Sequence, residues 1–514
     1  MSAVALSRPA RVLRIEIRRS VVPWSVPLIL ALFFFDSYRT AAGFPPNWTV
    51  HASAITNNLA WDFAPFAAGL GAWVASREGR RNTGDLLATT VRPAWARQAA
   101  ALGATLFWLL LTFLTAVAAL YIQVALQATW GGPPLWPVVV GAVQVVTLAV
   151  LGFTAGALFP GRFTAPLAAI GAFLLVFIGF HAALNLTPDS STNALLSPAT
   201  GLPLEDVGVF YHVAPDVAIA QVMFMGGITV ALLGVLVVAP VFRVRGGLSG
   251  AVGRAGRPLC AAGVVLLAAG VAASWTAFAL TGTAKLGVSG WDIPALHDAA
   301  SDQPIPYTPD CAGTAFPVCV HPAFSGYLPA AAAALQPVAA ELKGLPGAPV
   351  RAEEVPAAGE GMGATQGILL PGMPAPDVSG TPPVYRYDGN NGIAPFLGSP
   401  AGADNARWRA GFQQELLTEF IAGPPNAGPR PDASVLPPTA AQQAVITALM
   451  TVAGSQAQFG EDMTNGHPTA GATPAQIDAA AQRFASLSTA ARHAWLAAHL
   501  PALRVGEITL AQLP

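Results

Sequence analysis

The longest uncharged run of the chain limits its possible folds more than any other sequence feature. No residue from 98 to 161 is charged. A helix that crosses a bilayer needs about 20 mainly apolar residues, so this run is long enough for two such helices. Gly131-Gly132-Pro133-Pro134 interrupts it near the middle, and these residue types break helices. We therefore predict membrane-spanning helices over roughly 98–126 and 135–158.

Five further segments fit the same pattern, three of them well. The uncharged runs at 163–188, 217–242 and 258–284 each have the length of one span. The segments 21–42 and 56–76 are weaker candidates because Asp36 and Asp62 interrupt them, and a charge inside the bilayer is costly. The sequence therefore predicts a polytopic α-helical membrane protein with about seven spans.

Charge separates the chain into two unlike halves. Only 10% of the 514 residues are charged, against about 25% in ordinary soluble proteins. Residues 1–282 carry a net charge of +7 and contain no Lys, whereas residues 283–514 carry −8. The sequence contains no Lys/Arg stripe with interleaved aromatic residues, so we expect no nucleic-acid binding.

The positions of the arginines predict the orientation of the spans. Cytoplasmic loops of membrane proteins are enriched in Lys and Arg. Alternate loops of the predicted topology hold fifteen of the sixteen arginines in residues 1–282, and only Arg39 lies on the other side. We therefore expect a multi-pass protein of the plasma membrane with a cytoplasmic N-terminus. With seven spans, the chain after about Lys285 is extracytoplasmic.

The predicted exterior half consists of two parts. Pro- and Gly-rich turns, short apolar runs and helical stretches at 327–342 and 405–420 predict an α+β domain over 285–432, and a helical tail follows over 433–514. Cys311 and Cys319 are close enough in the sequence for a local disulfide. Such a bond would add about 2 to 3 kcal/mol of stability in an oxidising exterior. The alternative is two unrelated free thiols.

A polar segment joins the second and third predicted spans. Residues 77–93 begin with charges of both signs, continue with Leu86, Leu87 and Val91 at near-helical spacing, and end at Pro93. This pattern predicts an amphipathic helix at the inner membrane surface. The simpler alternative is a solvated, positively charged connector.

The same segment resembles the coupling helix of ABC-2 type permeases, the membrane subunits of ATP-binding-cassette exporters. The matching residues are Arg77-Glu78-x-Arg80, Thr83-Gly84-Asp85-Leu86-Leu87-Ala88-Thr89 and Val91-Arg92. Thr90 departs from the family, which often has proline there, and Pro93 follows instead. The resemblance implies that an ATPase subunit contacts this segment, with Arg77, Glu78, Arg80, Arg81, Thr83, Gly84, Leu86, Leu87 and Arg92 as the coupling residues.

The resemblance also implies an organisation for the whole chain. Residues 1–20 would form an interfacial elbow helix on the cytoplasmic side, and 21–242 a six-span permease core. Residues 243–284 would form a cytoplasmic loop and a seventh span, which the family core lacks, as it lacks the exterior domain. By analogy with the family, two permease subunits, identical or different, would work in the lipid bilayer with two ATPase subunits that bind ATP and Mg²⁺.

The chain itself contains no motif for nucleotide binding or hydrolysis. A phosphate-binding loop needs Gly-x-x-x-x-Gly-Lys, and the only lysines, Lys285 and Lys343, do not follow such glycines. His-Glu-x-x-His and Gly-x-Ser-x-Gly do not occur, and His493 and His499 have no nearby acidic residue to complete a metal site. We therefore expect neither a cofactor, nor a metal ion, nor enzymatic activity in this chain.

Polar residues within the predicted spans are candidates for a translocation path, because such residues are costly in a membrane. They are Asp62, Gln144 and His181. For Asp62 we favour a place at the outer interface, with Trp61 as an anchor. The sequence as a whole favours the permease subunit of an exporter. The alternative is a non-transporting membrane sensor or ligand-binding protein whose receptor domain lies outside.

Overall fold

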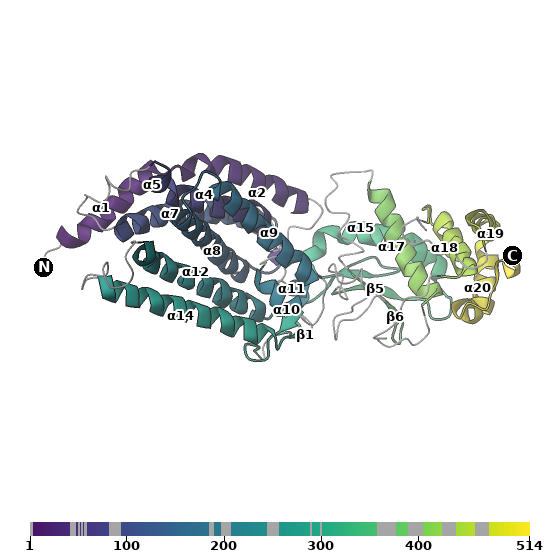
Figure 1. The fold of residues 1–514 in the computed structure, drawn as a ribbon. Coiled ribbons are helices and arrows are strands. Elements are labelled where there is room, and N and C mark those ends of the chain that lie inside the picture. The colour runs from purple at the N-terminus through teal and green to yellow at the C-terminus, as the bar shows by residue number, and fades with distance from the viewer. Residues whose placement is uncertain are drawn as a thin grey trace.

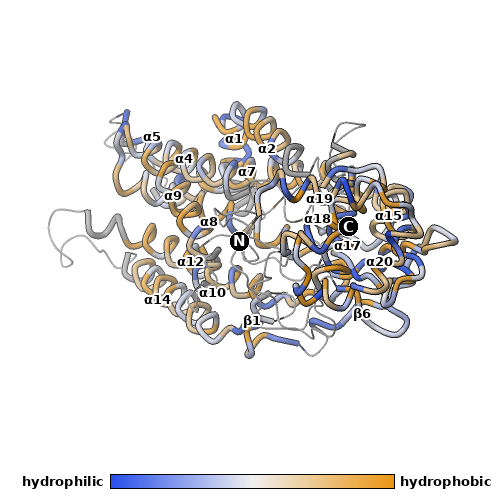
Figure 2. Tube along the Cα trace, turned by 90° about the vertical axis from the view of Figure 1, so that its right-hand side faces the viewer, coloured by the Kyte–Doolittle hydropathy of each residue, from blue (hydrophilic) through white to orange (hydrophobic). Residues whose placement is uncertain are grey.

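A helical half and a sheet-containing half lie end to end along the molecule (Figure 1). Apolar residues dominate the helices of the first half, whereas the second half alternates between polar and apolar residues (Figure 2). The computed structural model describes residues 4–41, 48–49, 52, 55, 59–81, 94–184, 190–196, 207–243, 256–287, 290–298, 301–356, 377–388, 404–423, 438–457 and 472–514.

Five helices are long and apolar enough to cross a membrane, and they match the five strongest predicted spans. They are α7 (Ala94–Ala125), α8 (Trp136–Leu158), α9 (Thr164–Leu184), α12 (Asp216–Arg243) and α14 (Gly256–Thr281). Large apolar side chains on these helices, such as Phe107, Ile170 and Val265, are exposed. An exposed apolar surface of this extent marks contact with a partner or a membrane. The helical half is therefore consistent with a membrane-embedded protein.

The two weaker predicted spans have irregular geometry. A bend of 50° separates the chain at Arg11–Trp24 from that at Val26–Ser37, and together these pieces would make a sixth span. The elements concerned are α1 (Val4–Arg19), η1 (Val22–Trp24) and α2 (Val26–Ala41). The other weak candidate consists of the π-helical turn η2 (Leu59–Phe63) and α4 (Ala64–Ala75), which are shorter together than the other spans. The count of seven stays a prediction.

Small residues allow the apolar helices to pack with their backbones in contact. Gly152 and Gly156 of α8 face Ala68 and Ala72 of α4 so closely that a Cβ atom on either glycine would overlap the backbone of α4. Glycines allow the same close backbone contact between α12 and α14. They are Gly227, Gly234, Gly263 and Gly270. Small residues that let helix backbones approach closely promote helix association in membranes, where apolar burial alone contributes little.

The sheet of the second half has five strands in the order β3-β4-β5-β7-β6. Its centre is parallel, because β4 pairs with β5 and β5 with β7 in parallel, whereas the edge strands β3 and β6 are antiparallel. The strands are β3 (Asp310–Ala312), β4 (Val318–Val320), β5 (Arg351–Val355), β6 (Asp377–Ser379) and β7 (Val384–Asp388). Cys311 and Cys319 face each other across β3 and β4 and form the predicted disulfide.

Helices cover this sheet and extend beyond it. The helix α15 (Leu328–Leu342) connects β4 to β5 and packs against α17 (Asp404–Ile421), close to the two predicted helical stretches. The predicted helical tail consists of α18 (Ala440–Val452), α19 (Pro474–Ser486) and α20 (Thr489–Arg504). An ion pair of 2.8 Å between Arg492 and Glu341 joins α20 to α15, and both side chains are mostly buried. The tail therefore shares one core with the sheet.

His321 lies at the junction of the two halves. Its side chain is fully buried between β4 and the turn η5 (Pro322–Tyr327). The imidazole ring lies 5.0 Å from the ring of Trp130 and 4.9 Å from that of Phe210, both of which belong to the helical half. Its Nδ1 accepts a hydrogen bond of 3.1 Å from the backbone N–H of Ala323. Aromatic packing around one histidine therefore holds the sheet-containing half against the helical half.

A short backbone ladder reinforces this junction. It joins the end of α11 (Val207–Phe210) to the chain before β3. The N–H of Ile305 donates to the carbonyl of Phe210 at 2.7 Å, and that of His212 donates to Gln303 at 2.9 Å. The N–H of Asp302 donates to the carbonyl of His212 at 2.6 Å.

The packing of α4 on α8 predicts that a glycine-to-alanine substitution changes stability differently at two positions. Gly152→Ala should lower the free energy of unfolding by about 1 to 3 kcal/mol, because the added methyl group forces the two backbones apart. Gly171→Ala on α9 has open space for its methyl group, and it should be neutral or stabilising by up to about 1 kcal/mol. Thermal unfolding of the full chain in detergent measures both. Equal effects of the two variants would contradict the contact.

The burial of His321 predicts a pH dependence of the junction. Burial lowers the pKa of this imidazole from 6.5 to about 4, so the folded protein keeps it neutral. Below pH 6.5 the unfolded chain takes up a proton that the folded chain does not, and stability falls as the pH falls towards 4. At pH 5 the loss is about 2 kcal/mol. His321→Asn keeps an acceptor for the Ala323 N–H. Between pH 7.5 and pH 5, the free energy of unfolding of this variant should therefore fall by about 2 kcal/mol less than that of the natural chain.

Candidate functional site

The arginine-rich end of the helical half is the candidate site. The helix α4 ends at Ala75, and the hydroxyl of the next residue, Ser76, donates to the carbonyl of Ala72 at 2.7 Å. The single turn α5 (Arg77–Arg80) follows. This turn lies at the end of the bundle that is far from the sheet (Figure 1). Gly79 packs directly on Pro160 in the connection between α8 and α9, where any side chain would clash. Arg162 belongs to the same connection, so two arginine-bearing connections lie side by side.

Arg77 and Glu78 link this turn to two other helices. The guanidinium of Arg77 lies 3.6 Å from the carboxylate of Glu16 on α1. The Glu78 carboxylate lies 3.5 Å from Arg97 on α7. Neighbouring residues thus contact two different helices, Arg77 the N-terminal helix and Glu78 the first long apolar helix. A hydrogen bond of 2.9 Å from the indole of Trp108 on α7 to the carbonyl of Ile17 holds α1 and α7 together.

Arg80 instead turns back onto the end of α4. Its guanidinium carbon lies 3.6 Å from the ring centroid of Trp73, and it donates a hydrogen bond of 2.9 Å to the Trp73 carbonyl. A cation over an indole ring is attracted to the π-electrons, and a cation also satisfies the free carbonyls at a helix C-terminus. Both interactions hold Arg80 at the edge of the site.

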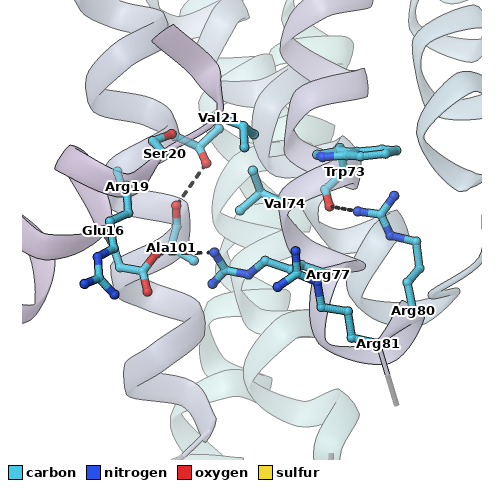
Figure 3. Close-up of a pocket in the computed structure, with 12 residues that line it drawn as sticks. Glu16, Arg19, Ser20, Val21, Trp73, Val74, Arg77, Arg80, Arg81 and Ala101 are labelled. Atoms are coloured by element: carbon cyan, nitrogen blue, oxygen red, sulfur yellow. Dashed lines mark hydrogen bonds and ion pairs between the residues drawn. The ribbon is translucent and has the colours of Figure 1, made fainter. Parts of the chain in front are cut away.

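A cavity of about 320 Å³ opens between these helices. Its walls come from α1, from the end of α4 with α5, and from α7, and four of the residues that line it are arginines. Figure 3 shows Arg77 directed across it towards Glu16, and Arg80 beside Trp73. The cavity is positively charged and therefore suits an acidic side chain or another anionic group. The arginines in the lining are Arg19, Arg77, Arg80 and Arg81.

The structure describes only the first part of the predicted coupling segment. Arg77, Glu78, Arg80 and Arg81 lie on or next to α5. The other predicted coupling residues, Thr83, Gly84, Leu86, Leu87 and Arg92, lie outside the described residues. The predicted elbow helix corresponds to α1, which runs along α7.

The three polar candidates for a translocation path lie on three different elements. Asp62 is half-buried in η2, beside Trp61, whose ring packs 5.7 Å from that of Phe173 on α9. Trp61 is therefore packed between helices. Gln144 is buried in α8, and its amide atoms have no hydrogen-bond partner among the residues that the structure describes. His181 is exposed near the end of α9.

The two histidines of the tail are held by backbone carbonyls. His493 donates through Nε2 to the Glu341 carbonyl at 2.7 Å. His499 donates through Nδ1 to the Trp495 carbonyl at 2.8 Å and stacks on the Trp495 ring. His493 therefore has its structural partner on α15, and His499 has its partner within α20.

Sequence reasoning did not find three residues that complete the arginine-rich end. Glu16 and Arg97 are the partners of Arg77 and Glu78, and Trp73 is the platform for Arg80. Of these three residues, only Trp73 could have been predicted from the sequence. Its spacing of seven residues from Arg80 places both on one face of a continuing helix. No protein-family model, curated protein or solved structure matches this chain.

Proposed function

We propose that this chain is the membrane-spanning permease subunit of an ATP-binding-cassette exporter. One observation carries the proposal: Arg77 and Glu78, which begin the segment that resembles a coupling helix, are paired with Glu16 of α1 and Arg97 of α7. A separate ATPase subunit, which binds ATP and Mg²⁺, supplies the energy. In this proposal the working unit also contains a second permease subunit, and the spans include η2 with α4 as the second of seven.

The two ion pairs provide a route for movement. When the ATPases close, they push the segment that begins at Arg77. Because Arg77 holds α1 and Glu78 holds α7, that push tilts both helices together and opens the space between permease subunits to the exterior. All four side chains are partly exposed, so each pair contributes less than about 1 kcal/mol to stability. The pairs direct the movement and are not needed for folding.

The opposite placement of the two halves supports the proposed orientation. The turn α5 and the sheet lie at opposite ends of the apolar helices (Figure 1). In the proposal the arginine-rich end is cytoplasmic, and the sheet-containing half stands outside, over the exit of the transport path. The disulfide between Cys311 and Cys319 fits an oxidising exterior.

Charge reversal tests the coupling role. Glu78→Arg should reduce recovery of the partner ATPase at least fivefold, because like charges on α5 and α7 would displace the segment that the ATPase contacts in this proposal. The double variant Glu78→Arg/Arg97→Glu should restore recovery. The tagged full chain is crosslinked in its native host, purified in mild detergent, and the co-purified ATPase with a Gly-x-x-x-x-Gly-Lys motif is quantified by mass spectrometry.

The control for this test is a matched ion pair far from the site. Glu353→Arg breaks the exposed pair of Arg351 with Glu353 in the sheet and should leave ATPase recovery unchanged. Undiminished recovery with Glu78→Arg would remove the coupling role. If the natural chain recovers no ATPase, the alternative of a non-transporting sensor is favoured.

Cysteine labelling tests the orientation. Arg81 and Lys343 are both exposed. Arg81 follows α5 at the arginine-rich end, and Lys343 follows α15 in the sheet-containing half. In a Cys260→Ala background, Lys343→Cys should react with a membrane-impermeant maleimide on intact cells, whereas Arg81→Cys should react only after the membrane is permeabilised. Labelling of Arg81→Cys on intact cells would reverse the proposed topology.

A further inference from the structure

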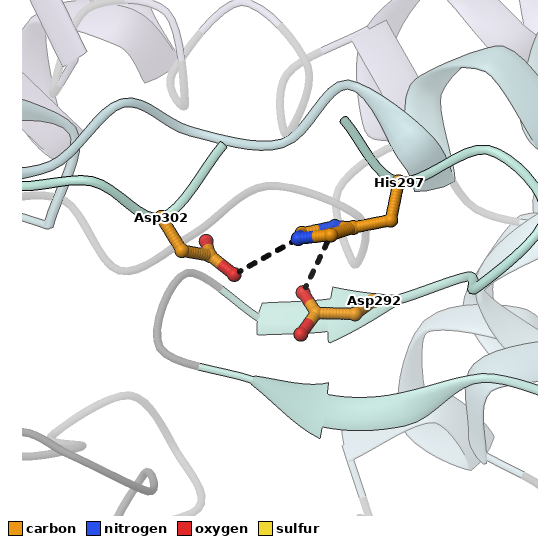
Figure 4. A group of neighbouring side chains, drawn as sticks. All are labelled: Asp292, His297 and Asp302. Atoms are coloured by element: carbon orange, nitrogen blue, oxygen red, sulfur yellow. Dashed lines mark ion pairs between the residues drawn. The ribbon is translucent and has the colours of Figure 1, made fainter. Parts of the chain in front are cut away.

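Four acidic or imidazole side chains gather where the apolar helices meet the sheet-containing half. Asp216 is the first residue of α12. Asp292 ends β2 (Gly290–Asp292), which pairs with β1 (Lys285–Gly287), and His297 and Asp302 follow it in the chain. Figure 4 shows the side chains of Asp292 and Asp302 directed at the imidazole of His297 from two sides.

The three side chains of this cluster lie close enough together for a metal site. Asp292 Oδ1 lies 3.8 Å from His297 Nδ1, and Asp302 Oδ2 lies 3.7 Å from His297 Nε2. One possible ligand atom from each of the three residues lies within 4.8 Å of the others. Ligand atoms about 2.1 Å from a shared ion lie at most about 4.2 Å apart. Because Asp292 is near Nδ1 and Asp302 is near Nε2, the Asp292 side chain would have to turn towards Nε2 before all three residues could share one ion.

Asp216 fixes the orientation of the imidazole. Its side chain is fully buried, and its Oδ2 accepts a hydrogen bond of 2.8 Å from the N–H of Ile293 and lies 3.2 Å from His297 Nδ1. A carboxylate on one imidazole nitrogen, with the other nitrogen free for an ion, is the usual arrangement around metal-ligating histidines. His297 Nε2 is the nitrogen that faces Asp302.

Buried carboxylate oxygens without hydrogen-bond partners among the described residues indicate that this cluster binds a cation. Asp216 Oδ1 and Asp292 Oδ1 are both buried without a hydrogen-bond partner in the described part of the chain. Lys285 is opposite Asp292 in the strand register, but no ion pair joins Lys or Arg to Asp216 or Asp292 among the described residues. Buried carboxylate oxygens without partners are rare and costly, and the side chain of Asp216 is wholly removed from solvent.

The short distance between the carboxylates of Asp292 and Asp302 also favours a bound cation. Possible ligand oxygens of Asp292 and Asp302 lie within 4.8 Å of each other. Two carboxylates this close repel each other when both are ionised. A bound divalent cation removes that repulsion.

We propose that Asp292, His297 and Asp302 bind one divalent metal ion of the Zn²⁺ class, and that Asp216 positions His297 for it. Mixed carboxylate and imidazole ligands suit Zn²⁺ and similar transition metals, whereas Ca²⁺ and Mg²⁺ prefer oxygen ligands alone. The site does not depend on the proposed transport function.

The ion would fasten the sheet-containing half to the apolar helices. Asp302 is held by its backbone to His212, just before α12, and Asp216 begins that helix. Asp292 and His297 come from the chain that leaves α14. One ion would therefore join the outer ends of α12 and α14 through their connecting segments.

Metal titration of the full chain tests the proposal. The protein in detergent is stripped with a chelator, dialysed and titrated with ZnCl₂, and bound metal is counted by mass spectrometry and calorimetry, with Ca²⁺ and Mg²⁺ as competitors. We expect one Zn²⁺ per chain. Asp292→Asn and His297→Gln should each weaken binding at least tenfold. Asp216→Asn should weaken it about 10- to 100-fold by loosening the imidazole. The exposed Asp310 gives the control, Asp310→Asn, with unchanged binding.

Each result decides for or against the site. Absence of stoichiometric Zn²⁺ from the natural chain would overturn the proposal, and so would displacement of Zn²⁺ by equimolar Ca²⁺. Full binding by folded Asp292→Asn or His297→Gln would place the ion elsewhere. If a variant fails to fold, the natural chain still supplies the test, because saturating Zn²⁺ should raise its thermal midpoint, and an unchanged midpoint would count against the site.

Discussion

Direct contact between helix backbones is the constraint on which the rest of this structure depends. Apolar helices gain little from burial against one another in lipid, so they need close packing to associate. Glycines and alanines provide it between α4 and α8, and glycines between α12 and α14. The hydroxyls of Thr147 and Thr229, 2.9 Å apart, join α8 to α12. These contacts tie four helices into one unit, and polar chemistry is left mainly to its two ends.

The two ends carry different chemistry. At one end, arginines surround a cavity, and two carboxylates, Glu16 and Glu78, direct them between helices. At the other end, Asp216, Asp292 and Asp302 converge on His297, and aromatic rings enclose His321. In the proposed function, the packed apolar helices couple a change at one end to the other end. Such coupling is what an exporter driven from the cytoplasm requires, and it would also serve a sensor that signals inward.

The features of this architecture that depend on residues close together in the sequence were predicted correctly. The five strong spans begin and end within a few residues of the helices α7, α8, α9, α12 and α14, because a long apolar run without charges is what a bilayer-crossing helix requires. The pair Cys311 and Cys319 was found for the same reason, since eight residues separate its members. The irregular turn at η2 was not predicted, nor was Trp61 as a packing residue, because both depend on the contact with α9. The count of seven spans and the coupling role of the 77–93 segment stay predictions.

Hydropathy and charge belong to each residue, so the order of amino acids is enough to show which segments are apolar, where the arginines cluster and which half is acidic. Which charges meet depends instead on how distant segments pack together. Arg77 and Glu16 are far apart in the chain, and 81 residues separate His297 from Asp216. No spacing rule connects such residues. They come together because the fold places α1 beside the end of α4, and the chain that follows α14 beside the first residue of α12.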